Sequence, residues 1–350
     1  MTRTDTRSPA RTPDAAPQPS STARAALWLG VGVAVIAALF VIDWLAPTLF
    51  PASLPTRAQD GLTLAISVLI ESLPFVALGV VLSIVVQVWV PPGVIERWLP
   101  RAAWARRAVL SLLGMLVPVC ECGNVPFARG LLMRGFTVPE TMTFLIAAPI
   151  VNPIVIITTH QAFGFSDGIL IARLLGGYAI ANLIGWLYSW HPSPDALLTD
   201  RFRATCELAL ETGHLSSGRW RRSIAQFAVE LRAVMPALII GSALAGAVQV
   251  LVPREALIAI GSNPALSIVA MMTLALVVSI CSNVDAFFAL SFASTFTPGS
   301  IVAFLLVGPI VDVKMIALLR TTFTWRALGG VVVIVLLAAF AIGTAVNLVA

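Results

Sequence analysis

The stretch Leu116-Val-Pro-Val-Cys-Glu-Cys-Gly-Asn-Val-Pro126 decides the fold of this chain. A long apolar run breaks there at Pro118, presents two cysteines and a carboxylate, and resumes after Gly123. Proline and glycine interrupt helices, and Asn124 is a suitable N-cap for a new helix whose first turn tolerates Pro126. The stretch therefore predicts a helix, a break and a second helix.

A later stretch, Ser279-Ile-Cys-Ser-Asn-Val-Asp285, repeats this pattern. Aligning Cys122 with Cys281 places Cys-Gly-Asn-Val-Pro on Cys-Ser-Asn-Val-Asp. Pairs of broken helices with polar residues at the breaks are typical of the substrate sites of secondary transporters. The two stretches therefore favour a transporter with its site at the breaks.

The composition is that of an all-α polytopic membrane protein. Of the 350 residues, 58% are hydrophobic and only 11% are charged, whereas a soluble domain has about 25% charged residues. Several segments reach the roughly 20 apolar residues that cross a bilayer. The net charge of +5 lies mostly in loops and in the N-terminal tail, so it reports orientation and gives no indication of nucleic-acid binding. The sequence contains no nucleotide fingerprint, serine triad or histidine pair with metal-ligand spacing, so we expect no metal, no cofactor and no enzyme activity.

The apolar segments fall into two similar halves. In each half a span with a glutamate and a proline precedes a broken pair, and Ala148-Pro-Ile-Val-Asn152 in the first half matches Gly308-Pro-Ile-Val-Asp312 in the second. Four elements that match in order indicate a duplication. The expected organisation is a disordered cytoplasmic tail at 1–24, a retained transmembrane helix at 25–46, a first membrane repeat at 62–190, a cytoplasmic polar loop at 191–222 and a second membrane repeat at 223–350.

The arginines predict the orientation of the two halves. If the tail is cytoplasmic, the span at 62–90 returns inward and places the arginines of 97–107 inside, as the positive-inside rule requires. Each limb of 108–133 has about 10–16 apolar residues, which suits a segment that enters and returns. The arginines of 201–222 then also lie inside. The halves would therefore be inverted repeats with broken or re-entrant helices, and the C-terminus would face outside.

Ten residues at the breaks are expected to line a substrate site at the bilayer midplane: Cys120, Glu121, Cys122, Asn124, Pro126, Asn152, Cys281, Asn283, Asp285 and Asp312. In an extended stretch residues i and i+2 share a side, so Cys120 and Cys122 could face one cavity, with Cys281 arriving from the other repeat. Thiolates bind thiophilic metals and metalloids. The alternative is that the buried cysteines serve only as small apolar side chains. Cys206, in the polar loop, is expected to have no role.

Carboxylates at membrane depth are costly and usually functional. Three of them fall at this depth: Glu121, Asp285 and Asp312. They either serve a proton-coupled cycle or form structural ion pairs with Arg129, Arg134 or Lys314. The asparagines are expected first as helix caps, whereas Glu71 and Glu230 are expected at the membrane interface.

The quoted motifs resemble the predicted permease family typified by YraQ and ArsP. The resemblance rests on Val-Cys-Glu-Cys-Gly-Asn-Val-Pro, Ala-Pro-Ile-Val-Asn-Pro, Ser-Ile-Cys-Ser-Asn-Val-Asp-Ala-Phe and Gly-Pro-Ile-Val-Asp, and it covers roughly residues 60–345. ArsP-type members export trivalent organoarsenicals. The resemblance therefore implies an efflux permease of the plasma membrane, with a small-molecule substrate and the lipid bilayer as partners.

The residues themselves leave three classes of protein open. The first is a secondary transporter for a small thiophilic or anionic solute. The second is a membrane thiol redox enzyme that uses Cys120 and Cys122, although its usual spacing is C-x-x-C. The third is an ion channel lined by the two breaks. A second copy of the chain or an accessory subunit stays open as a partner.

Overall fold

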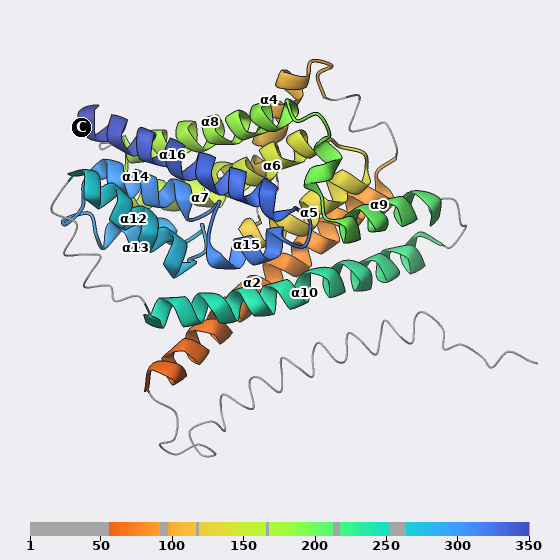
Figure 1. The fold of residues 1–350 in the computed structure, drawn as a ribbon, viewed down its shortest axis with the longest axis horizontal. Helices are drawn as coiled ribbons and strands as arrows, with labels where there is room; N and C mark the ends of the chain where they lie inside the picture. Colours follow the sequence, from red (N-terminus) through yellow and green to blue (C-terminus); the bar gives the residue numbers. More distant parts are fainter. Residues whose placement is uncertain are drawn as a thin grey trace, which may run out of the picture. The chain divides into compact units, whose positions relative to one another are not determined.

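The computed structural model describes residues 56–91, 97, 99–116, 119–165, 168–212, 218–251 and 264–349. These residues form an all-α polytopic membrane protein, as the composition predicted (Figure 1). Five of their helices are long and apolar enough to cross a bilayer, at Ala58–Trp89, Val138–Phe163, Ile169–Ser189, Arg219–Val250 and Trp325–Val349. The expected tail at 1–24 and the expected helix at 25–46 lie outside the described residues.

The first half, coloured orange to green in Figure 1, consists of α2 (Thr56–Ile84) with its π-helical extension η1 (Val85–Trp89), α4 (Ala103–Leu112) with the 3-10 turn η2 (Leu113–Met115), α5 (Glu121–Met133), α6 (Val138–Val151), α7 (Pro153–Phe163) and α8 (Ile169–Ser189). The connection contains η3 (Pro194–Leu197) and α9 (Asp200–Thr212). The second half consists of α10 (Arg219–Leu251), α12 (Pro264–Val278), α13 (Asp285–Leu290), α14 (Pro298–Val307), α15 (Val313–Leu319) and α16 (Trp325–Val349).

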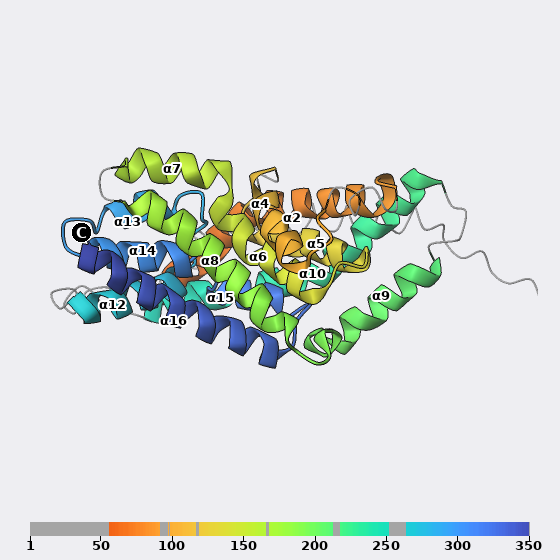
Figure 2. The same ribbon diagram turned by 90° about the horizontal axis from the view of Figure 1, so that it is seen from above.

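The helices of the two halves follow one order and pack in corresponding pairs. In the first half α4 packs against α6 and α8, and in the second α12 packs against α14 and α16. Across the halves α2 packs along α10, and α8 lies alongside α16 (Figure 2). The packing is consistent with the duplication that the sequence indicates. The inverted orientation of the halves stays a prediction.

The described part of the connection, expected as a polar loop at 191–222, contains helices and contacts the second half. Besides containing α9, it pairs with the turn between α15 and α16. Leu198 forms an isolated antiparallel bridge with Phe323, and the amide of Thr199 donates to the carbonyl of Thr322 at 2.9 Å. The amide of Thr324 donates to the carbonyl of Leu197 at 2.8 Å, so the connection is fixed to the second half.

The helix after the first break begins one turn earlier than the sequence predicted. Helix α5 starts at Glu121 with Cys120 as its N-cap residue, so Asn124 is not the cap. The amides of Gly123 and Asn124 already bond to the carbonyl of Cys120, at 3.1 and 3.2 Å. Gly123 therefore does not interrupt the helix. It allows a close crossing instead, because a Cβ at this position would collide with the backbone oxygen of Phe75 on α2.

The second break shows the same difference. Helix α13 starts at Asp285 after Val284, so Asn283 is not its cap. The amides of Val284 and Asp285 bond to the carbonyl of Cys281, at 3.0 and 3.1 Å. Ser279 enters the break with a φ of 49°, in the left-handed region that non-glycine residues seldom adopt.

The Pro-Ile-Val motifs end in side-chain caps. Asn152 caps α7 by accepting a hydrogen bond from the amide of Ile154 at 2.9 Å, which confirms the capping role expected of this residue. Asp312 caps α15 by accepting from the amide of Met315. Each cap pairs an amide at the start of its helix that has no partner within the helix.

Candidate site at the two helix breaks

Glu121, at the start of α5, is held by the second break. Its side chain is buried, with 1% of its surface exposed. Its Oε2 accepts hydrogen bonds from the Ser282 hydroxyl at 2.9 Å and from the Ser282 amide at 3.4 Å. The Cys281 thiol donates to the same oxygen, with Sγ at 3.8 Å. The two breaks, which are far apart in the sequence, therefore meet at one carboxylate.

Lys314 supplies the positive charge opposite this carboxylate. Its Nζ lies 3.3 Å from Oε1 of Glu121, and both side chains are buried. Lys314 follows Asp312 on the first turn of α15, so the second Pro-Ile-Val motif places the lysine beside the breaks. The Oδ2 atom of Asp312 is buried and has no hydrogen-bond partner among the described residues.

The cysteines of both breaks gather around Glu121. The ligand atoms of Cys120, Glu121 and Cys122 all lie within 4.8 Å of one another. The Cys120 side chain interacts with the thiols of both Cys122 and Cys281. The Cys122 thiol also donates to the Ser72 hydroxyl on α2, with Sγ at 3.6 Å. Two sulfur donors and one carboxylate thus lie close to one another, and the Cys281 thiol contacts the same carboxylate. Sulfur donors of this kind suit a thiophilic atom.

The other predicted site residues of these segments play different parts, and all but the half-buried Asn283 are buried. Neither polar atom of the Asn124 side chain has a hydrogen-bond partner in the described chain, although the residue is fully buried. The Oδ1 atom of Asn283 is also buried without a hydrogen-bond partner among the described residues. Buried polar atoms without a partner are rare in proteins. Pro126 is buried inside α5. Asn152 donates to the carbonyl of Val119 at 3.0 Å, so it fixes the backbone within the first break, just before α5.

Asp285 is engaged in a bidentate ion pair with Arg173. The two Nη atoms of Arg173 lie 3.0 and 2.6 Å from the Asp285 carboxylate oxygens, and Nη1 also donates to the Thr159 hydroxyl at 2.8 Å. The pair is fully buried and joins α7 and α8 to α13. Arg173 escaped the sequence analysis, although it is the one charged residue of an otherwise apolar span, which is a sufficient signal.

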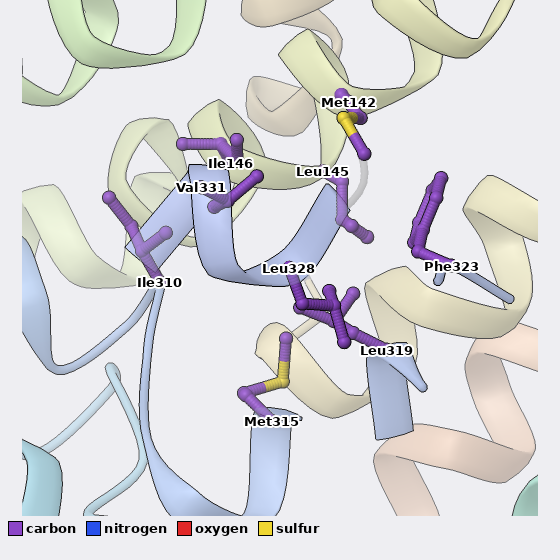
Figure 3. A pocket seen from close by; sticks show the side chains of 9 residues that line it. All are labelled: Met142, Leu145, Ile146, Ile310, Met315, Leu319, Phe323, Leu328 and Val331. Carbon is purple, nitrogen blue, oxygen red and sulfur yellow. The ribbon is translucent and has the colours of Figure 1, made fainter. Parts of the chain in front are cut away.

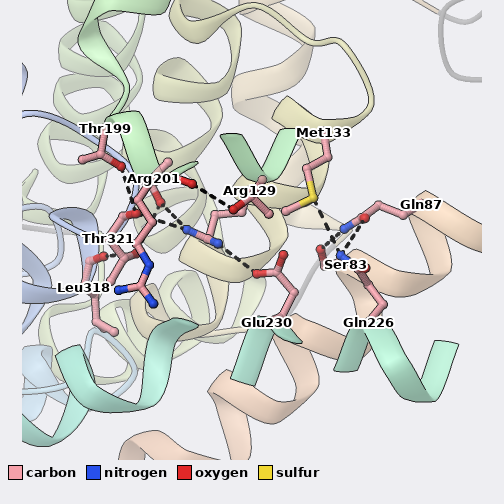
Figure 4. Close-up of polar contacts among 12 residues, drawn as sticks. Ser83, Gln87, Arg129, Met133, Thr199, Arg201, Gln226, Glu230, Leu318 and Thr321 are labelled. Atoms are coloured by element: carbon pink, nitrogen blue, oxygen red, sulfur yellow. Dashed lines mark hydrogen bonds and ion pairs between the residues drawn. The ribbon is translucent and has the colours of Figure 1, made fainter. Parts of the chain in front are cut away.

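Arg129 and Glu230 form another buried ion pair, shown in Figure 4, with Nε 2.8 Å from Oε2. The Nη1 atom of Arg129 donates to the Thr321 carbonyl and the Thr322 hydroxyl, both at 3.3 Å. Its guanidinium lies 4.4 Å from the ring centroid of Phe202 on α9. Glu230 is thus buried in a structural ion pair, whereas its expected place at the membrane interface stays a prediction.

The three carboxylates that were expected at membrane depth thus have different partners in the structure. Glu121 pairs with Lys314, as one alternative proposed, and Asp285 pairs with an arginine that was not considered. Asp312 acts as a helix cap.

Two further features lie outside the cysteine site. The small cavity in Figure 3 is lined only by apolar side chains, among them Met142, Met315 and Phe323, and encloses about 10 Å³. That is about the space of one water, and apolar cavities of this kind stay dry, so it is a packing gap. Burial raises the pKa of the Cys206 thiol on α9 to about 11. This thiol therefore stays protonated and weakly nucleophilic at neutral pH.

Comparison with known proteins identifies the family. The family model ArsP_1, described as "Predicted permease", matches residues 58–348. The chain belongs to this predicted permease family. It is 38% identical over 287 residues to the "UPF0718 protein YcgR" of Bacillus subtilis (strain 168), which covers 77% of this chain and 92% of that protein.

A second relative comes from Streptococcus mutans serotype c (strain ATCC 700610 / UA159). It is named "Putative two-component membrane permease complex subunit" and is 33% identical over 270 residues, which is 77% of this chain and 89% of that protein. No solved structure matches the chain. Membership in the family makes this chain a multi-pass membrane permease, and it leaves the transported solute open.

Proposed function

We propose that this permease is a secondary transporter of the plasma membrane that exports a small thiophilic solute, such as a trivalent organoarsenical. The solute would bind between the two breaks, at Cys120, Cys122 and Cys281. The observation that carries the proposal is the gathering of these three thiols around Glu121. A purely structural role for the cysteines would not require them to meet from two distant segments.

The chemistry of the donor set suits trivalent arsenic. A thiol that attacks an As–OH group forms an As–S bond as the As–O bond breaks. Glu121 is positioned to receive the proton of the Cys281 thiol and to pass it to the leaving hydroxide, which departs as water. A second thiol can repeat the exchange, and water reverses both steps, so the solute is bound and released without an oxidant or a reductant.

The proposal includes a role for the polar residues of the breaks. Asn124, Asn283 and Asp312 each hold at least one buried polar atom without a partner among the described residues. These atoms could satisfy the hydroxyl or water groups that accompany the solute. The name of the S. mutans relative mentions a two-component complex, so we include an accessory subunit as a partner of this chain.

Uptake of a trivalent organoarsenical into everted membrane vesicles that contain the full chain tests the proposal. We expect uptake that depends on an ion gradient. In a variant with Cys120, Cys122 and Cys281 all changed to Ser, the rate of uptake should fall at least about tenfold. Cys206→Ser is the matched control and should transport normally. Normal uptake by the triple variant would rule out sulfur ligation.

A further inference from the structure

A cavity of about 410 Å³ lies between α2, the end of α10 and the second break. This volume falls within the range of small-molecule sites. Its lining includes Glu71 from α2, Gln249 from α10, and Ser279 and Ile280 from the break. The Gln249 side chain donates to the carbonyl of Val278, so it pairs a backbone group at the end of α12 beside the cavity.

The cavity lies beside the cysteine site. Glu71 precedes Ser72, whose hydroxyl accepts from the Cys122 thiol, and Ile280 precedes Cys281. The cavity and the sulfur cluster therefore lie on neighbouring residues of the same two segments. At the other end of α2 and α10, Gln87 contacts Gln226, and the buried Arg129–Glu230 pair lies nearby (Figure 4).

Ser279 indicates that the cavity receives a polar ligand. Only 3% of its surface is exposed, it lines the cavity, and its hydroxyl has no hydrogen-bond partner in the described part of the chain. Its φ of 49° is a conformation that serine adopts at a cost, and such residues concentrate at functional sites.

The charge of the cavity is negative. Glu71 is the one acidic or basic side chain among the described lining residues, so its ionised carboxylate makes the lining negative. A cavity with a negative lining and low-dielectric walls concentrates cations and repels anions.

We infer that this cavity is the vestibule through which the solute reaches or leaves the cysteine site, and that Glu71 makes it selective for neutral and cationic solutes over anions. The inference rests on the proposed function for the identity of the solute and adds its charge class. The sequence left open a thiophilic or an anionic solute. A vestibule of this kind admits only thiophilic solutes that carry no negative charge.

The test uses a cysteine reporter in the vestibule and does not require transport. In the full chain with Cys120, Cys122, Cys206 and Cys281 changed to Ser, Ser279→Cys provides a single thiol. Its modification by cationic and by anionic methanethiosulfonate reagents is timed in proteoliposomes, and each rate is divided by that for free cysteine. We expect the cationic reagent to be favoured about tenfold or more, and Glu71→Gln to bring the ratio close to one.

Two other single-cysteine variants of the same chain serve as controls. Ser67→Cys, which lines the same cavity one turn from Glu71 and is exposed, should react readily and show the same preference for the cationic reagent. Ser242→Cys, on α10 and buried away from the lining, should stay unmodified. A folded Ser279→Cys chain that reacts with neither reagent would overturn the vestibule, and so would reaction only with an apolar neutral reagent, which would indicate lipid in the cavity.

A charge ratio that Glu71→Gln leaves unchanged would overturn the role of Glu71. Because the reporter chain lacks the native cysteines, these outcomes are independent of arsenical uptake. If uptake fails while the reporter behaves as expected, the proposed solute is wrong and the vestibule stands. If uptake succeeds while the reporter is silent, the solute takes another route.

Discussion

Glu121 connects the two halves of the candidate site at the scale of single residues. One oxygen accepts from Ser282 and Cys281 of the second break, and the other faces Lys314 of α15. A buried carboxylate of this kind is stable only because its charge and its lone pairs are matched. The residue that starts α5 is therefore fixed by contacts that form only when both halves are folded.

The Arg173–Asp285 pair leads to a stability prediction. Changing Asp285 to Ala leaves a buried guanidinium without its counter-ion, which costs about 3–5 kcal/mol in the free energy of unfolding. The double variant Arg173→Met with Asp285→Leu removes both charges and should recover most of this loss. Unfolding of the detergent-solubilised chain, followed by circular dichroism, measures the difference. Equal destabilisation of the single and double variants would contradict the pairing.

Sequence reasoning identified the residues of the breaks but not most of their partners. Cys120, Cys122 and Cys281 were recognisable because cysteines at breaks in apolar segments repeat in both halves. Ser72 and Arg173 were missed because a hydrogen-bond partner depends on which helix faces the site. Periodicity along one helix does not carry that information.

At the scale of helices, the crossing of α2 and α5 sets the position of the first break. Gly79 and Gly123 face each other so closely that a Cβ on either would collide with the backbone of the other helix. The sequence reading took Gly123 as a helix breaker, because local propensity alone cannot distinguish a break from a close crossing. For the same reason, the sequence analysis placed the N-cap of this helix at Asn124.

This crossing predicts a pair of contrasting alanine variants. Gly123→Ala should push α2 and α5 apart and destabilise the chain by about 1–3 kcal/mol. Gly329→Ala, on α16 with open space around it, should be neutral or stabilising by up to about 1 kcal/mol. Melting temperatures of the two purified variants provide the comparison. A Gly123→Ala chain as stable as the unchanged one would mean that the helices do not approach this closely.

At the scale of the whole molecule, the two halves share the order of their helices and much of their packing. The amino-acid sequence predicted this order of helices because its motifs recur in the same order in both halves. It could not predict that the connection folds into α9 and pairs with the turn at 321–324, since those contacts depend on the assembled halves. The inversion of one half relative to the other rests on the arginine distribution.

The orientation of the chain in the membrane can be tested directly. With the arginines of 97–107 and 201–222 inside, the C-terminus should face the outside. A fluorescent reporter that folds only in the cytoplasm should be dark when fused to the C-terminus and bright when inserted near residue 215. Bright fluorescence at the C-terminus would contradict the inverted arrangement.

The central claim is that cysteines of two distant breaks form one site, and an arsenic bridge tests it most directly. Phenylarsine oxide condenses with two thiols and releases one water, so it links cysteines that lie close together. In the Cys206→Ser chain, digestion and mass spectrometry should find arsenic joining a peptide with Cys120 or Cys122 to the peptide with Cys281. Arsenic confined to the 120–122 peptide, or absent from all three cysteines, would contradict the claim.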